Sequence, residues 1–283
     1  MVQALKAFAI GLVVGAFFST LLREPLLDAL RKPVAMAENY RGERIPALSG
    51  LLFVFALLAS LPLMAVLAVD PLPLFQFSGA VSAMALVGLV DDVLGGKGPR
   101  GWRGHLGALG EGHITSGILK ALAGGLLGLG LAVSRPSSPG FWVLDAVGFA
   151  LFTNAPNLLD VRPGRALKGF FLAYLGLLAW QGPWSLSFSA PLLGGLLVYA
   201  GQDLRGRVMM GDVGSNALGA ALGFIFVMGP PAGKPWVVSF LLLYHYLAER
   251  HSLSRLIEGL PLLRWADSLG TRGRKGIDEA SEE

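Results

Sequence analysis

The sequence predicts an all-α, polytopic integral membrane protein: a bundle of about nine transmembrane helices, with the N-terminus outside and the C-terminus in the cytoplasm. Three observations support this fold class. Of 283 residues, 53% are hydrophobic and only 15% are charged, which is too little charge for an ordinary soluble domain. The apolar residues form long runs, and nearly all basic residues lie in alternate connections between those runs.

Nine apolar runs approach the roughly 20 residues that a helix needs to cross a bilayer. The first ends at Arg23 without a small-residue cleavage site, so we expect a retained helix instead of a signal peptide. The fifth, sixth and eighth runs are interrupted by polar residues or proline, and buried half-helices are an alternative there. The runs are residues 4–22, 50–69, 72–90, 115–133, 140–158, 165–180, 184–202, 214–229 and 235–249.

The distribution of basic residues predicts the orientation of these spans. If the spans alternate, the connections after the first, third, fifth and seventh spans and the segment after the ninth face one side. The opposite side keeps only Lys6, Arg135 and Lys234, so the positive-inside rule places the basic side in the cytoplasm. The basic side carries 20 of the 23 lysines and arginines: Arg23, Arg31, Lys32, Arg41, Arg44, Lys97, Arg100, Arg103, Lys120, Arg162, Arg165, Lys168, Arg205, Arg207, Arg250, Arg255, Arg264, Arg272, Arg274 and Lys275.

The chain divides into three parts. Residues 1–250 form the predicted transmembrane domain. Residues 251–270 alternate apolar side chains with charged ones, which predicts an amphipathic helix on the cytoplasmic surface or a docking helix for a partner, kinked or split at Pro261. Residues 271–283 are polar and contain glycine, which predicts a disordered tail.

Several classes of function are disfavoured by composition and pattern. The chain has no cysteine, which excludes disulfides, cysteine-bound zinc, iron–sulfur clusters and thiol catalysis. The net charge of +4 lies in short loops between apolar runs, so it indicates membrane orientation and no nucleic-acid partner. A transporter is disfavoured because no inverted repeat is visible and because the only candidate for an ionisable residue in mid-membrane, Asp145, lies near the outer end of its span. Glycine-rich helix faces are compatible with a homodimer but do not decide it.

Four polar segments lie at the predicted cytoplasmic ends of the spans. Carboxylates gathered on one membrane face repel one another unless a cation joins them. Hard oxygen ligands suit Mg²⁺, which typically binds through one or two carboxylates and substrate phosphates. The segments therefore predict phosphate chemistry at a membrane surface. They are Asp91-Asp92, Asn154 to Asp160, Met210 to Ser215, and Arg41 to Pro46.

Each segment also has a purely structural explanation. An aspartate pair at the end of a span is often a solvated helix end. Asn154 and Asn157 are able to satisfy the backbone of a broken helix. Asp212 and Ser215 are typical of a helix cap and turn, and the Arg41 to Arg44 cluster is typical of an anchor to anionic headgroups. For any one segment alone, the structural explanation is favoured. Four such segments on one membrane face together favour a functional site.

The order of these motifs resembles a known family. Asp91-Asp92, then Asn154-x-x-Asn157-x-x-Asp160, then Met210-Gly-Asp-x-Gly-Ser-x-x-Leu-Gly219 is similar to the polyprenyl-phosphate N-acetylhexosamine-1-phosphate transferases. This family includes the phospho-N-acetylmuramoyl-pentapeptide transferases and the GlcNAc-1-phosphate transferases of envelope polymer synthesis. The resemblance runs from about residue 30 to residue 225, and its last motif is the most specific.

The resemblance implies a reaction and roles for its matching residues. Such enzymes move a sugar-1-phosphate from a UDP-sugar to a membrane polyprenyl phosphate, release UMP and use Mg²⁺. By resemblance, Asp212 is the principal Mg²⁺ ligand, and Asp91 or Asp92 deprotonates or orients the lipid phosphate. Lys120 holds a phosphate as a point charge. The remaining carried-over residues line the nucleotide or metal pocket: Asn154, Asn157 and Asp160, with Arg44 in the first loop as a further substrate contact.

The chain departs from the family pattern at three places. Pro163 stands where the family usually has a second aspartate, and the neighbouring Arg162 and Arg165 are candidates to clamp a phosphate instead. The last cytoplasmic loop is usually rich in histidine, whereas this chain offers only His245 and His251 there. The usual tenth span is missing.

Two hypotheses follow from the resemblance. The first is a sugar-1-phosphate transferase of the bacterial plasma membrane, acting on polyprenyl phosphate and a UDP-sugar with its active site facing the cytoplasm. The second is a non-catalytic paralogue that binds polyprenyl phosphate or assists assembly. Pro163 and the histidine-poor loop favour the second; the set of Asp91, Asp92, Lys120 and Asp212 favours the first. The sugar and the pathway stay open.

Overall fold

The computed structural model describes residues 2–39, 41–67, 71–95 and 101–270. Within these ranges a long helix lies at each of the nine predicted spans. The predicted disordered tail, residues 271–283, lies outside the described residues. The long helices are α1 (Val2–Leu30), α2 (Leu51–Leu67), α3 (Pro71–Leu94), α5 (Ser116–Val133), α6 (Pro139–Asn154), α7 (Arg165–Gln181), α8 (Leu186–Asp203), α9 (Gly211–Met228) and α10 (Lys234–Arg250).

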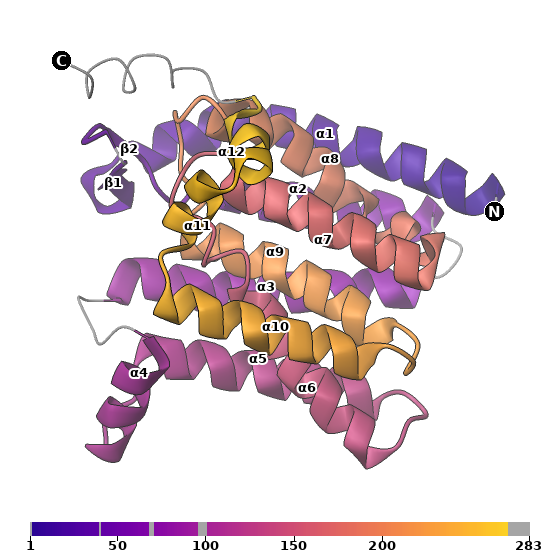
Figure 1. The fold of residues 1–283 in the computed structure, drawn as a ribbon. Helices are drawn as coiled ribbons and strands as arrows, with labels where there is room; N and C mark the ends of the chain where they lie inside the picture. Colours follow the sequence, from indigo (N-terminus) through magenta and orange to yellow (C-terminus); the bar gives the residue numbers. More distant parts are fainter. Residues whose placement is uncertain (1, 40, 68–70, 96–100, 271–283) are drawn as a thin grey trace.

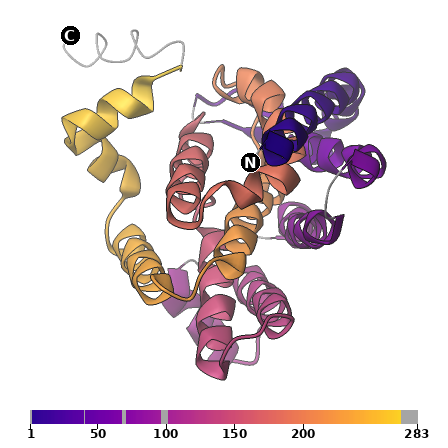
Figure 2. The same ribbon diagram turned by 90° about the vertical axis from the view of Figure 1, so that its right-hand side faces the viewer.

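The long helices run side by side, and their connections lie at the two ends of the bundle (Figure 1). Helix α1 packs on α2 and α8, while α9 lies between α3, α6 and α7. Seen from the end of the bundle, α9 occupies its middle and α10 stands at the edge beside α6 (Figure 2). The chain is therefore a helical membrane-type bundle around one central helix.

Five segments are long and apolar enough to cross a membrane by length and composition, counted over the described residues: α1, α3, α5, α8 with the residues before it, and α9. Helix α2 is apolar but shorter. Helices α6, α7 and α10 have 16, 17 and 17 residues. The prediction of several membrane spans is confirmed, while the count of nine and the orientation stay predictions.

Two details of the predicted elements were wrong. The fold is not purely α-helical, because β1 (Met36–Glu38) and β2 (Arg44–Pro46) form an antiparallel hairpin between α1 and α2. Asn39 closes this hairpin: its Oδ1 accepts hydrogen bonds from the backbone N–H groups of Arg41 (2.8 Å) and Glu43 (3.0 Å). Helix α6 ends at Asn154, four residues before the predicted end, because Pro156 lacks the backbone donor that would continue it.

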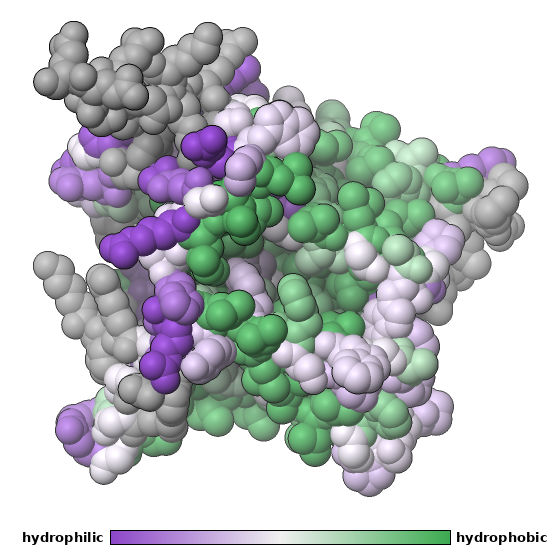
Figure 3. All heavy atoms as spheres, viewed as in Figure 1, coloured by the Kyte–Doolittle hydropathy of each residue, from purple (hydrophilic) through white to green (hydrophobic). Residues whose placement is uncertain are grey.

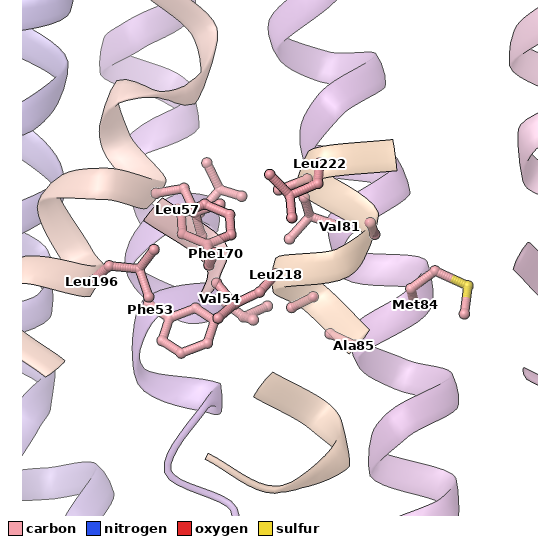
Figure 4. Close-up of a cluster of buried hydrophobic side chains, with 14 of the residues drawn as sticks. Phe53, Val54, Leu57, Val81, Met84, Ala85, Phe170, Leu196, Leu218 and Leu222 are labelled. Carbon is pink, nitrogen blue, oxygen red and sulfur yellow. The ribbon is translucent and has the colours of Figure 1, made fainter. Parts of the chain in front are cut away.

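Apolar side chains from five helices fill the middle of the bundle (Figure 4). Phe53, Leu57, Phe170 and Leu218 are almost fully buried there. Because lipid is as apolar as these side chains, close packing instead of exclusion from water stabilises such contacts. The middle of the bundle is accordingly a rigid frame for the polar residues at its ends.

The ends of the bundle differ in polarity. Hydrophilic side chains gather at the left-hand end in Figure 3, and apolar side chains cover the middle of this face. The hairpin, the short helix α4 (Gly101–Gly110) and the C-terminal helices α11 (Leu253–Gly259) and α12 (Pro261–Ser268) lie at the left-hand end (Figure 1). The break between α11 and α12 falls directly before Pro261, where the sequence predicts a kink or split.

Candidate active site

Three helices bring two carboxylates to one ammonium group. Lys120 lies in the second turn of α5, whose start is capped by Thr115. Its Nζ forms ion pairs with Asp91, near the end of α3, and with Asp212, in the first turn of α9. The Lys120 residue is only 9% exposed, so the charges interact with little screening by solvent. With Asp92, these residues form the carboxylate–lysine site.

Asp92 has a different partner from its neighbour. Its two oxygens accept hydrogen bonds from the backbone N–H groups of Asp212 (3.0 Å) and Val213 (2.8 Å). These are among the N–H groups that the start of a helix leaves without a partner, and a carboxylate is favoured there by the helix dipole. Asp92 therefore caps α9 from α3, while Asp91 faces the ammonium of Lys120.

Gly211 allows this cap to form. Its backbone has φ +69°, and a Cβ at this position would lie 2.4 Å from the carbonyl oxygen of Ala47 and 2.8 Å from an oxygen of Asp92. A side chain at residue 211 would thus be strained and would push the cap away. The Gly-Asp order of the motif follows from this geometry.

The first polar loop is attached directly to the start of α9. The backbone N–H of Met209 donates to the carbonyl of Pro46 (2.8 Å), and those of Ser49 and Gly50 donate to the carbonyls of Met209 (3.0 Å) and Met210 (3.1 Å). Two of the four polar segments, far apart in sequence, therefore form one wall beside the carboxylate–lysine site.

The α6–α7 loop (residues 155–164) approaches the same site. Ser215 Oγ lies 3.4 Å from Oδ1 of Asn157. Asp160 is half-buried. Burial raises the pKa of its carboxyl well above the usual value of 3.8, and the charges of Asp203, Asp212 and Asp92 raise it further. The carboxyl of Asp160 therefore interacts with the negative charges of three other aspartates near the site.

The remaining predicted residues have other surroundings. Asn154 is the last residue of α6 and is half-buried. Arg44 is exposed on β2. Arg162 pairs with Glu258 of α11 (2.8 Å), and Arg165 is buried in an ion pair with Asp267 of α12 (2.8 Å). The geometry favours a docking role for Arg165 over the predicted phosphate clamp, because its charge already has a buried counter-ion.

A pocket beside the site contains residues that the sequence analysis did not select. Asp203, at the end of α8, is 3% exposed and accepts a hydrogen bond from the hydroxyl of Tyr199 (3.0 Å). An aspartate four residues after a tyrosine at the end of an apolar run was the available signal. The pocket encloses about 30 Å³ and is lined by Asn39, Ile45, Asp160, Val161, Arg162, Pro163, Asp203, Val208 and Met209.

The donor set suits a hard divalent cation that shares its ligands with a substrate. Among the described residues, no group of three or more histidines or acids is placed to hold a metal ion by itself. Asp91 and Asp212 nevertheless converge on one cationic group, with Asp92 beside them. Two carboxylates with further oxygen ligands from phosphates are the usual protein contribution to a Mg²⁺ site, so these residues fit such an ion.

Known proteins are similar to this chain over most of its length. A phospho-N-acetylmuramoyl-pentapeptide-transferase of Moorella thermoacetica is 33% identical over 255 residues, covering 81% of this chain and 76% of the relative. The enzyme of the same name from Chlamydia trachomatis is 28% identical over the same shares of both chains. A third, from Gloeothece citriformis, is 35% identical but over only 34% of this chain.

No family model matches the chain. The similarity to the Moorella enzyme, 33% identity over 81% of this chain, is nevertheless sufficient, and motifs of the resemblance meet in space at the carboxylate–lysine site. The chain therefore belongs to the polyprenyl-phosphate N-acetylhexosamine-1-phosphate transferase family, of which the phospho-N-acetylmuramoyl-pentapeptide transferases are members.

Proposed function

We propose that this protein transfers a sugar-1-phosphate from a UDP-sugar to a polyprenyl phosphate at the cytoplasmic face of a bacterial plasma membrane. The observation that carries the proposal is the ammonium of Lys120 held between Asp91 and Asp212 at the ends of three helices. Phosphoryl transfer depends mainly on positioning and on neutralising phosphate charge. The fixed ammonium of Lys120 would position a phosphate and neutralise part of its charge, and the two carboxylates beside it are of the kind that binds Mg²⁺.

The reaction makes one bond and breaks one. An oxygen of the lipid phosphate attacks the phosphorus that carries the sugar, and UMP leaves with the bridging oxygen. Lys120 binds phosphate oxygens as a point charge. Asp91 orients the lipid phosphate, because its neighbour Asp92 is engaged as the cap of α9. The product is a polyprenyl diphosphate sugar.

Asp212 and Asp91 would hold Mg²⁺ together with oxygens of the donor diphosphate. When bound there, Mg²⁺ would supply positive charge that neutralises the phosphates. The protein contributes the fixed position of Asp212, since Asp92 and Gly211 hold the start of α9 in place. Affinity for Mg²⁺ is expected to rise when the donor is present, because the donor completes the ligand set.

The pocket beside the site is the proposed place for part of the nucleotide. Asp160 and Asp203 offer acceptors for hydroxyl or N–H groups, while Val208 and Met209 offer apolar surface. The names of the relatives make phospho-N-acetylmuramoyl-pentapeptide the first donor group to test.

The test is release of UMP by the purified, detergent-solubilised protein supplied with undecaprenyl phosphate, Mg²⁺ and a panel of UDP-sugars. Asp212→Asn is the control variant. We expect turnover with one donor class, and its loss in Asp212→Asn without loss of folded protein. Undiminished turnover in that variant would remove the metal assignment.

A non-catalytic paralogue is the second candidate, and the position of Pro163 favours it. Pro163 lines the pocket at the point where the family resemblance implies a carboxylate, and proline neither binds metal nor accepts a proton. Retained Mg²⁺-dependent binding of undecaprenyl phosphate, with no UMP from any donor, would support this candidate over the transferase.

A further inference from the structure

The α6–α7 loop is held at three points. The first point faces the carboxylate–lysine site, where Asn157 lies against Ser215 of α9 (3.4 Å). Asp160 follows three residues later and is close enough to Asp212 and Asp92 to be affected by their charges. The position of this loop therefore decides where two polar side chains stand relative to the site.

The second point is the end of the loop, where α8 holds it. The backbone N–H of Gly164 donates to Oδ2 of Asp203 (2.7 Å), and the hydroxyl of Tyr199 donates to Oδ1 (3.0 Å). Tyr199 is fully buried and Asp203 nearly so. A buried carboxylate whose two oxygens both accept hydrogen bonds is a fixed anchor.

The third point is a buried ion pair with the C-terminal helices. Arg165, the first residue of α7, donates from Nε to Oδ1 of Asp267 (2.9 Å) and from Nη2 to Oδ2 (2.8 Å). The side chains are 3% and 6% exposed. The third guanidinium nitrogen, Nη1, donates to Oγ of Ser254 (2.7 Å), so the same arginine contacts both α11 and α12.

Two further contacts extend this attachment. Lys168 Nζ donates to the backbone carbonyl of Asp267 (2.6 Å), and Arg162, inside the loop, pairs with Glu258 of α11 (2.8 Å). A planar guanidinium that meets a carboxylate with two parallel hydrogen bonds fixes orientation as well as distance. Removing the carboxylate of Asp267 would leave the buried guanidinium of Arg165 with the more distant, half-exposed carboxylate of Glu258 (3.7 Å) as its counter-ion.

We propose that Arg165 and Asp267 are positioning residues for the donor side of the site: the helix pair α11–α12 is a strap that holds the α6–α7 loop against the carboxylate–lysine site. The inference rests on the proposed transferase activity. It predicts that loss of the strap weakens binding of the sugar nucleotide, which contacts the loop, more than it slows the chemical step or weakens binding of the lipid phosphate.

The kinetic test is Asp267→Asn, an isosteric change that removes the buried charge of the pair. We expect KM for the UDP-sugar to rise about tenfold, with kcat and KM for undecaprenyl phosphate changed by less than about threefold. The double variant Arg165→Met with Asp267→Leu replaces the ion pair by apolar side chains and is expected to restore KM, because apolar replacements of a buried pair keep the contact.

The matched control is Asp28→Asn, which breaks an exposed ion pair between Asp28, in the last turn of α1, and Arg31, directly after α1 (2.7 Å). This variant is expected to leave kcat, KM for the UDP-sugar and KM for undecaprenyl phosphate unchanged. Glu258→Gln breaks a half-exposed pair and is expected to raise KM less than Asp267→Asn does. The positioning role would be overturned if Asp267→Asn changed kcat and both KM values equally. It would also be overturned if the double variant did not restore KM for the UDP-sugar.

A second readout does not require turnover. Because the chain has no cysteine, a single spin label can be placed at Val161→Cys in the loop or at Leu262→Cys in α12, both of which are exposed. Asp267→Asn is expected to increase label mobility at both positions. Increased mobility at residue 262 with none at residue 161 would overturn the strap, whereas absent turnover in the unmutated protein would count only against the proposed function.

Discussion

Lys120 sits where three negative side chains meet. Two of them, Asp91 and Asp212, form ion pairs with its ammonium. The third, Asp92, accepts hydrogen bonds from backbone N–H groups instead. The site is thus held together by one cation and has net negative charge. We therefore expect this site to favour a divalent ion and to bind phosphate only when cations are present.

Replacing Lys120 by methionine tests this balance. We expect the rate of UMP release to fall by at least about 100-fold, because a preorganised charge at the phosphates is lost. Thermal stability is also expected to fall, since Asp91 and Asp212 would face each other without their ammonium. Adding Asp91→Asn to this variant is expected to restore stability but not activity. A rate within threefold of the unmutated protein would contradict the role of Lys120.

Asp160 predicts a dependence of stability on pH. Its raised pKa means that the folded protein keeps the proton to higher pH than the unfolded chain does. Between pH 3.8 and the raised pKa, the folded state therefore binds more protons than the unfolded chain does. The free energy of unfolding falls as pH rises through this range. Asp160→Asn removes this contribution, so its stability relative to the unmutated protein is expected to increase with pH.

The measurement is thermal unfolding in detergent from pH 4 upward for both proteins. Parallel curves for the unmutated protein and Asp160→Asn would show that the carboxyl of Asp160 titrates alike in the folded and unfolded states.

At this scale the sequence predicted the centre of the site better than its surroundings. Asp91, Asp92 and Asp212 were selected because their motifs lie at the ends of spans on one side, and Lys120 was added by the family resemblance. Asp203 was not selected, since one acid at the end of an apolar run is typical of a solvated helix end. The pairing of Arg165 with Asp267 spans 102 residues, and only the folded chain shows it.

Helix α9 is the element that connects the site to the rest of the fold. Asp92 caps its start. At its other end, Arg135 and Lys234 donate to the carbonyl of Val227, and Gln181 donates to that of Ile225. Donors from other segments thus satisfy carbonyls that the end of a helix leaves free. With both ends held, α9 presents Asp212 at a fixed depth.

The close approach of α3 to α9 can be tested with two glycines of α3. A Cβ at Gly88 would lie 2.2 Å from the backbone oxygen of Asp212, whereas a Cβ at Gly79 would meet nothing within 4 Å. We expect Gly88→Ala to lower stability by about 1–3 kcal/mol through overpacking and to reduce activity by displacing Asp212. Gly79→Ala is the matched control and is expected to be neutral or slightly stabilising.

Thermal unfolding and UMP release measure both variants. Equal behaviour of Gly88→Ala and Gly79→Ala would show that α3 and α9 have room to separate.

The elements themselves were largely predictable. A long helix lies at each of the nine predicted positions, because apolar runs bounded by polar residues are a strong signal. The hairpin was missed, since strands of three residues carry too short a pattern and their pairing depends on the turn at Asn39. The end of α6 was placed too late because the predicted span was extended past Pro156 and two asparagines to Leu158.

The whole molecule has one polar end, which holds the hairpin, α4, the carboxylate–lysine site and the C-terminal helices (Figures 1 and 3). The exposed apolar side chains of α11 and α12 include Leu260, Leu262 and Trp265. With Arg255 and Arg264 on the same two helices, they fit the predicted location at an anionic membrane surface.

The orientation is testable because the chain has no cysteine. Single cysteines at Gly107, in α4, and at Ser138, before α6, mark the two ends of the bundle. With the polar end in the cytoplasm, a membrane-impermeant maleimide is expected to label Ser138→Cys in intact cells. Gly107→Cys should react only after permeabilisation. The reverse labelling pattern would refute the predicted orientation.

The ion pair at the far end of α9 bears on how the protein is made. Asp145 of α6 and Lys234 of α10 are both 2% exposed and pair with each other, yet 89 residues separate them. With α6 as a membrane span, as the sequence predicts, Asp145 is synthesised long before its counter-ion Lys234, and an acid without its partner in a span is costly. The packing of α6 and α10 beside α9 is therefore complete only once α10 has been inserted. A chain stopped before Lys234 would lack this ion pair and keep only the charge of Arg135 near Asp145.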